Sequence, residues 1–142
     1  MTALERPRTI HRVRVGYGDT DQARVVHHAS YLRYLEQARV EFLRDNGLEY
    51  GTWEKKEKVG LPVVELSVRY RAPARFDDLL EIETWVGKAT RASITFAYRV
   101  RCGARVLADA TVRLACVGLE DGVLHRVPDE VLRACWGPAH GV

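Results

Sequence analysis

The sequence is poor in cysteine, and the three cysteines that it has lie far apart along the chain. Cys102, Cys116 and Cys135 are odd in number and lack the close pairing of a metal knuckle, which argues against a disulfide framework and against a zinc site. We therefore interpret all three as buried thiols.

Long apolar runs are also missing. No stretch approaches the roughly 18 apolar residues that a membrane-spanning helix needs, and residues 1–8 are polar and contain a proline, unlike a secretory signal. We therefore expect a cytoplasmic protein without a membrane span. A chain of 142 residues has the length of a single domain, so we predict one domain over 1–142.

A concentrated charge of one sign is the third absence. The net charge of +3 results from 22 basic and 19 acidic residues that are spread along the whole chain, so no basic stripe indicates nucleic acid. Arginine supplies 18 of the 22 positive charges, and its planar guanidinium binds phosphate through two parallel hydrogen bonds. The composition therefore favours an anionic small molecule as the partner.

The first half of the chain predicts a strand, a loop and a long helix. Residues 10–17 alternate, with Val13, Val15 and Tyr17 on one face, and the turn-forming residues that follow place a loop over 18–28. Apolar residues then recur at helical spacing from Tyr31 to Leu43. Gly47 is a plausible helix stop, and a short second helix or an ordered loop is expected over 48–58.

The second half follows a period of two, which is typical of strands. We predict strands over 64–70, 80–86, 92–100 and 106–117, a possible edge strand over 123–127, and a short helix from Asp129. Consecutive strands with short connections favour an antiparallel sheet. The fold class is thus α+β, with the sheet wrapped around one long helix. Such a sheet leaves a face or an edge exposed, so we expect at least a dimer.

The segment from Tyr17 to Tyr31 collects two aspartates and two histidines in a loop that enters a helix. The first turn of a helix has backbone N–H groups without intrahelical partners, and together with the macrodipole they favour negative charge nearby. A carbonyl oxygen that becomes an oxyanion is such a charge.

Several segments together resemble the 4-hydroxybenzoyl-CoA thioesterase family, and the bacterial branch associated with the Tol-Pal cluster is most similar. The similar segments are the Asp-x-Asp turn, the run Val-Val-His-His-Ala-Ser-Tyr, Tyr34-Leu35-Glu36-Gln37-Ala38-Arg39, residues 70–78 and residues 112–128. The resemblance implies a hotdog fold, hydrolysis of acyl-CoA thioesters, no metal and no cofactor. It also implies a homodimer or a homotetramer built as a dimer of dimers, with active sites at subunit interfaces.

Carried over by position, the resemblance makes Asp21 the catalytic carboxylate and gives the backbone N–H near His28 the task of polarising the thioester carbonyl. A thiol leaves with little help from an acid because its pKa is about 8.5. Asp21 then acts either as a nucleophile that forms a mixed anhydride or as a general base toward water, and the sequence leaves both routes open. Arg24 stands where these enzymes usually have glycine, which bears on the loop conformation.

Other residues of the chain are weaker candidates. We predict that His27 and Tyr31 contact the substrate; His27 stands where the branch often has tyrosine, which bears on the shape of the acyl pocket. Glu36 is the reserve catalytic residue, although an ion pair with Arg39 or Arg33 is an equally good reading. Lys88, Arg91 and Arg126, near strand ends, are candidate ligands of the CoA phosphates.

Further residues have competing structural readings. Asp19 is expected to be structural, bonded within its own loop. Trp53 and Phe76 belong either to an acyl pocket or to the core. A metal held by His27, His28 and the aspartates is disfavoured, because adjacent histidines in a loop diverge.

Hydrolysis of an acyl-CoA is thus the first functional hypothesis. The alternative is a hotdog protein that binds an acyl-CoA or an acyl carrier protein without hydrolysing it, since fold alone does not separate the two. A dehydratase on the same fold would need a histidine and a carboxylate paired across the interface. Serine hydrolase chemistry is disfavoured because the sequence has no G-x-S-x-G elbow.

Overall fold

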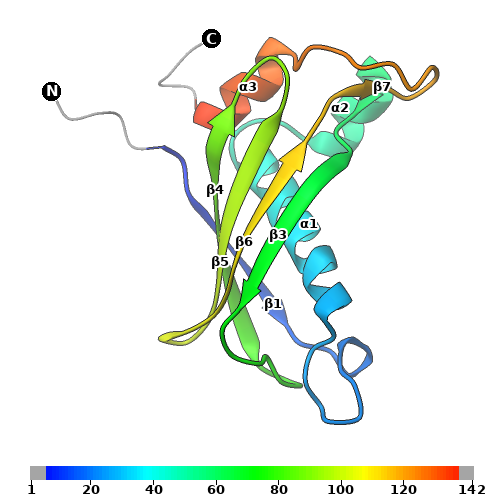
Figure 1. The fold of residues 1–142 in the computed structure, drawn as a ribbon. Coiled ribbons are helices and arrows are strands. Elements are labelled where there is room, and N and C mark those ends of the chain that lie inside the picture. Colours follow the sequence, from blue (N-terminus) through cyan, green and yellow to red (C-terminus); the bar gives the residue numbers. More distant parts are fainter. Residues whose placement is uncertain (1–5, 138–142) are drawn as a thin grey trace, which may run out of the picture.

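The computed structural model describes residues 6–137. A five-stranded antiparallel sheet has the order β1-β4-β5-β6-β3 and curves around the long helix α1 (Figure 1). Its strands are β1 (Thr9–Arg14), β3 (Val63–Tyr70), β4 (Leu79–Ala89), β5 (Ile94–Cys102) and β6 (Arg105–Leu114). The helices are α1 (His28–Asp45), α2 (Tyr50–Glu57) and α3 (Asp129–Trp136). The α+β hotdog architecture expected from the sequence is confirmed.

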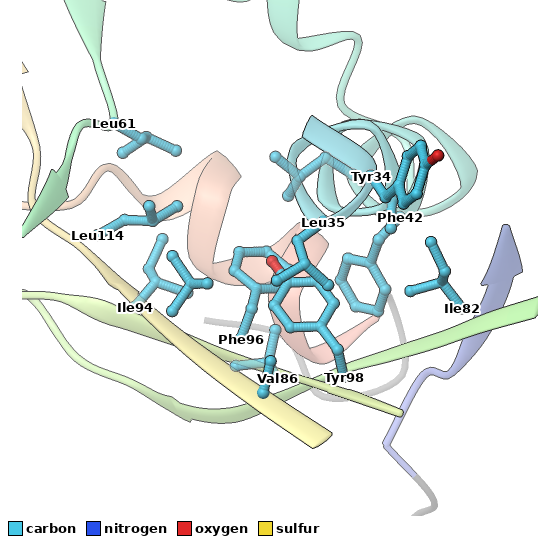
Figure 2. Packing of buried hydrophobic residues seen from close by; sticks show 14 of the residues in the cluster. Tyr34, Leu35, Phe42, Leu61, Ile82, Val86, Ile94, Phe96, Tyr98 and Leu114 are labelled. Atoms are coloured by element: carbon cyan, nitrogen blue, oxygen red, sulfur yellow. The ribbon is translucent and has the colours of Figure 1, made fainter. Parts of the chain in front are cut away.

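The core lies between α1 and the inner face of the sheet. Leu35 and Phe42 point from α1 toward the sheet, where Phe96, Tyr98 and Ile82 meet them (Figure 2). Phe42 and Phe96 pack edge to face, with their ring centroids 5.5 Å apart. The helical spacing and the alternation of the strands therefore predicted the faces that meet in the core.

Three expectations about where strands begin and end were wrong. β1 ends at Arg14, and Tyr17, expected on its buried face, starts a short 3-10 turn, η1 (Tyr17–Asp19), and is 62% exposed. This happens because the chain turns at Gly16, whose carbonyl accepts the N–H of Asp19.

The strand expected over 106–117 is divided. β6 ends at Leu114, the N–H of Ala115 bonds to the carbonyl of Pro62, and β7 (Val117–Gly118) pairs instead with β2 (Val59–Gly60). No strand forms over 123–127, where only a single bridge joins Val117 to Leu124. The side chain of Asp121 accepts the N–H of Val123 and forms a turn there.

Two of the three cysteines are buried as expected, but Cys102, at the end of β5, is only half-buried. Within the part of the chain that the structure describes, no helix combines the length and apolarity needed to cross a bilayer.

Candidate active site

The loop between β1 and α1 folds into a tight turn around Asp21. The N–H of Asp21 donates to the carbonyl of Val25 (3.0 Å), and the N–H of Arg24 donates to the carbonyl of Asp21 (2.9 Å). The side chain of Asp21 closes the turn, because its Oδ1 accepts the N–H groups of Ala23 (2.8 Å) and Val25 (3.4 Å). The residue remains exposed. These two hydrogen bonds hold Oδ1 of the carboxylate in place, and the other oxygen, Oδ2, remains for chemistry.

Arg24 adopts the left-handed backbone conformation, with φ at 62°. Glycine reaches this region freely, whereas a residue with a Cβ adopts it at a cost of about 1 kcal/mol. The carbonyl of Arg24 accepts the N–H of Phe76 (3.1 Å), which ties the turn to the segment before β4. The loop therefore has a glycine-like conformation at the position where the resembling enzymes usually have glycine.

The N-terminus of α1 provides donors beside this turn. His27 occupies the cap position, and its carbonyl accepts the N–H of Ser30 (3.0 Å). This leaves the N–H groups of His28 and Ala29, in the first turn, without intrahelical acceptors. The ring of His28 stacks on Tyr70 with 4.4 Å between centroids, and Tyr70 Oη donates to the carbonyl of His28 (3.2 Å). The first turn is thus anchored through its carbonyl while its N–H groups remain available to an oxyanion.

A pocket of about 280 Å³ adjoins this helix terminus. Tyr31 forms part of its wall, lies edge-on to Tyr70 and is only 2% exposed; burial raises the pKa of Tyr31. The lining residues are Val25, Val26, His28, Tyr31, Tyr70, Arg71, Ala72 and Pro73. Asp21 and His27 do not line this pocket, although nearby residues of the same loop do. Of the predicted site residues, the structure brings His28 and Tyr31 together in the pocket wall and places Asp21 in the adjoining turn.

Asp19 is buried and faces α1. Its Oδ2 accepts Tyr34 Oη (2.7 Å) and the N–H of Gly16 (3.3 Å), and its Oδ1 forms an ion pair with Arg33. Burial opposes ionisation, but the hydrogen bonds from Tyr34 and Arg33 outweigh it and hold the pKa of the Asp19 carboxyl below its usual value. The expected bonding of the Asp19 side chain within its own loop is limited to the N–H of Gly16, and its other partners, Tyr34 and Arg33, lie on the helix.

Glu36 lies two turns beyond His28, about 12 Å along the helix axis. It lines a second, larger pocket of about 420 Å³ at the other end of α1. The lining residues are Glu36, Arg39, Val40, Leu43, Tyr50, Glu54, Gly60, Leu61, Pro62, Leu114, Val117 and Leu119. Among residues 6–137, Glu36 has no ion pair with Arg39 or Arg33, since Arg33 is paired with Asp19. The ion-pair reading of Glu36 was therefore wrong.

The three candidate phosphate ligands lie at the end of the sheet opposite the Asp21 turn, where the β4–β5 connection meets α3 (Figure 1). Lys88 and Arg126 are exposed. Arg91 donates to the carbonyl of Val127 (2.8 Å) and forms an ion pair with Asp129, at the start of α3. Arg91 therefore holds α3 in this chain, and none of the three reaches the Asp21 turn of its own subunit.

The two aromatic candidates for the acyl pocket, Trp53 and Phe76, differ in burial. Trp53 is buried, and its Nε1 donates to Glu130 (2.7 Å), so it joins α2 to α3 as a core residue. Phe76 is 39% exposed and packs on Tyr17 with 4.8 Å between centroids. Tyr70 was not among the predicted site residues, because the alternation over 64–70 predicts a strand but does not show that Tyr70 meets His28.

In the described range, 6–137, no group of three or more histidine, cysteine, aspartate or glutamate side chains is arranged to hold a metal ion. The carboxylate of Asp19, which a metal at this loop would need, is engaged by Arg33 and Tyr34 instead.

An antiparallel sheet wrapped around a single long helix defines a hotdog-fold protein, and the candidate site of this protein is the carboxylate turn at the helix N-terminus. Residues 15–135 match the Thioesterase-like superfamily. The chain belongs to this family.

Curated relatives and solved structures agree with this assignment. The chain is 40% identical to the acyl-CoA thioesterase YbgC of Haemophilus influenzae, over 75% of this chain and 79% of that protein. It is 41% identical to the acyl-CoA thioester hydrolase YbgC of Escherichia coli, over 74% and 78%. A hypothetical protein of Thermus thermophilus, TT1821, superposes with a TM-score of 0.83 at 38% identity, over 89% of this chain and 95% of that chain. A probable thioesterase of Bartonella henselae superposes with a TM-score of 0.76 at 32% identity, over 85% and 98%.

Proposed function

We propose that this thioesterase hydrolyses the thioester bond of an acyl-CoA, with Asp21 as the catalytic carboxylate and the first turn of α1 as the oxyanion hole. The observation that carries the proposal is the Asp21 turn itself, which fixes Oδ1 with two backbone N–H groups beside a helix terminus with free donors. The YbgC relatives of H. influenzae and E. coli, named for this activity, support the substrate class.

The chemistry requires few groups. Asp21 either attacks the carbonyl carbon, forming a mixed anhydride as the thiolate departs, or takes a proton from a water that attacks the same carbon. Either route places negative charge on the carbonyl oxygen, where the N–H groups of His28 and Ala29 and the helix dipole stabilise it. The thiolate is a good leaving group, so no separate general acid is required.

We further propose that the active unit is a dimer formed by antiparallel pairing of two β3 strands. Leu66 and Tyr70 lie on the inner face of the sheet, since they pair with the buried Val112 and Ala108. Yet they are 42% and 38% exposed, even though Tyr70 contacts His28 at the start of α1. An edge strand with exposed apolar side chains is a template for pairing, and a second copy would both extend the sheet and cover the edge.

This pairing would bring unlike ends together. β3 begins beside the larger pocket, after Leu61 and Pro62, and ends at Tyr70, which contacts His28. In an antiparallel pair the start of one strand faces the end of the other. The Asp21 turn of one subunit would then face the larger pocket of its partner, which we propose as the acyl site. Glu36 would line that site rather than act as the nucleophile.

The same arrangement would carry Lys88, Arg91 and Arg126 of the partner toward the Asp21 turn, where we keep them as candidate ligands of the CoA phosphates. Arg91 would serve this role only by sharing its guanidinium with Asp129. Five expectations stay predictions from the sequence. They are the branch of the family, an acyl carrier protein as the acyl donor, assembly as a dimer of dimers, activity without a cofactor, and a cytoplasmic location.

The test measures thiol release from a panel of aliphatic and aromatic acyl-CoAs, for the unaltered protein and for Asp21→Asn. Asparagine keeps the shape of the side chain and can still accept the turn hydrogen bonds, but it has lost the charge. We expect turnover to fall about 10³-fold, within the range for loss of an acid–base or nucleophilic group. Glu36→Gln is the matched control and should retain turnover within about tenfold. If the unaltered protein binds acyl-CoA but releases no thiol from any substrate, the non-hydrolytic alternative replaces this proposal.

A further inference from the structure

Asp19 is a buried carboxylate that the proposed chemistry does not use, and it is bonded to α1 through both of its ends. Its side chain accepts Tyr34 Oη and pairs with Arg33, one turn into the helix. Its backbone carbonyl accepts the N–H of His27 (2.9 Å) and Ser30 Oγ (3.4 Å), at the helix cap. It stands two residues before Asp21.

Within the described part of the chain, the rest of the loop has no such link to the helix. The Asp21 turn is closed by bonds among residues 21–25, and Val26 donates to the carbonyl of Ala74 (2.8 Å), before β4. Among residues 6–137, all hydrogen bonds that join residues 18–26 to α1 or its cap involve Asp19. Asp19 is therefore the residue through which the loop is hydrogen-bonded directly to the start of α1 in this part of the chain.

We propose that Asp19 is a positioning residue for the thioesterase reaction: through Tyr34 and Arg33 it sets the carboxylate of Asp21 in register with the oxyanion-binding N–H groups of α1. The inference rests on the proposed function. Asp21 and the N–H groups must act on two atoms of the same carbonyl, with the reacting atoms about 3–3.5 Å apart, and an error of 1 Å costs roughly 100-fold in rate. A charged carboxylate that accepts hydrogen bonds from two side chains holds such a register better than a neutral side chain does.

The decisive variant is Asp19→Asn, which keeps the volume and loses the charge. We expect kcat to fall about 10–100-fold, while KM and the affinity for a non-hydrolysable S-alkyl-CoA change by less than about twofold. Tyr34→Phe keeps the buried ring, removes only the hydroxyl, and should lower kcat in the same direction. Both changes break the same contact, the one between Asp19 and Tyr34. The double variant should therefore be about as slow as the slower single variant.

Asp109→Asn is the matched control. Asp109 is also held by two side chains, Arg71 (2.6 Å) and Arg99 (2.7 Å), but it lies on the sheet face turned away from α1. This variant should lose stability and keep kcat. A readout that needs no turnover accompanies it: amide hydrogen exchange over residues 20–29 should accelerate in Asp19→Asn and remain unchanged in Asp109→Asn.

The outcomes separate the two proposals. If Asp19→Asn retains kcat and its exchange over residues 20–29 is unchanged, Asp19 is not a positioning residue. Equal losses of kcat in Asp19→Asn and Asp109→Asn would assign the effect to general stability and also overturn the inference. If the unaltered protein hydrolyses no thioester, the proposed function fails, and the exchange measurement alone then decides whether Asp19 holds the loop.

Discussion

The two ends of α1 differ in a complementary way. At the N-terminal end, the Asp21 turn and the helix donors lie beside a pocket of about 280 Å³. At the other end, a pocket of about 420 Å³ has mostly apolar walls, and its described lining residues include no turn carboxylate comparable to Asp21. One end has the reactive groups and the other has the larger space.

The difference between the two ends is what the proposed pairing of subunits explains, because each subunit would then supply half of a site. β3 joins the two ends along one exposed edge, whereas the opposite edge strand, β1, has its inward-facing Val13 packed against the core and its Val15 buried beyond it. Between residues 6 and 137, only the β3 edge of the sheet leaves inward-facing apolar side chains uncovered. A two-fold pairing at β3 would therefore bring each reactive end to a larger pocket.

The sharpest test of this comparison is complementation between two inactive variants. Asp21→Asn removes the reactive end. Gly60→Val fills the larger pocket, because a Cβ at Gly60 would lie 3.0 Å from Leu119 Cδ2 and 3.4 Å from Glu54 Oε2. We expect each variant to lose turnover, Asp21→Asn by about 10³-fold. Refolding equal amounts together should restore about a quarter of the original activity, since half of the random dimers would have one intact site.

Refolding each variant by itself under the same conditions is the control. If the mixture remains inactive while size-exclusion chromatography shows mixed dimers, the reactive end and the larger pocket act within one subunit and the proposed pairing is wrong.

The second test places a charge on the exposed edge. Leu66→Lys on β3 should weaken dimerisation by roughly 2 kcal/mol, the cost typical of a central interface residue, and turnover should become dependent on protein concentration. The measurement is sedimentation equilibrium together with activity over a dilution series. Ile10→Lys, on the opposite edge strand and 53% exposed, should leave both unchanged; an equal effect of the two variants would refute the assignment of the interface to β3.

The smallest effect concerns the backbone of the reactive end. Arg24→Gly should raise the free energy of unfolding by about 0.5–1 kcal/mol, because Arg24 pays for a left-handed conformation that glycine adopts freely. The gain is limited by the greater freedom of glycine in the unfolded chain.

Thermal unfolding measures this gain in stability of Arg24→Gly, with an expected rise of about 2–4 °C in Tm. Lys58→Gly is the control, since Lys58 has the same conformation, with φ at 56°, at the C-cap of α2 and outside the Asp21 turn. A fall in Tm for Arg24→Gly beside a rise for Lys58→Gly would mean that the arginine side chain stabilises the loop.

Much of the fold was predictable because its periodicities are strong. The spacing from Tyr31 to Leu43 predicted α1, and the alternation from Val64 to Val100 predicted three of the five strands of the sheet. The errors occurred where a local contact overrides the pattern. Tyr17 continues the alternation of β1 but leaves the sheet at Gly16, and the strand expected to run to Val117 breaks because β2 offers a second partner.

The site was predictable only in part. Asp21 and His28 are neighbours along the chain, so turn chemistry and the helix start already brought them together in the sequence. Tyr70 and Tyr34 are 49 and 13 residues from Asp21, and no local pattern predicts that one stacks on His28 while the other bonds to Asp19. The ion-pair reading of Glu36 was wrong because Arg33 pairs with Asp19, and Arg91, which stays a candidate phosphate ligand, also pairs with Asp129.

The sequence by itself determined the helix, the alternating strands and the carboxylate turn, because propensity, periodicity and turn chemistry act over a few residues. The tertiary structure decided which side chains hold that turn against α1 and which apolar face remains open at β3. Both depend on contacts between segments far apart in the chain, whose free energy exists only once the core has brought those segments together.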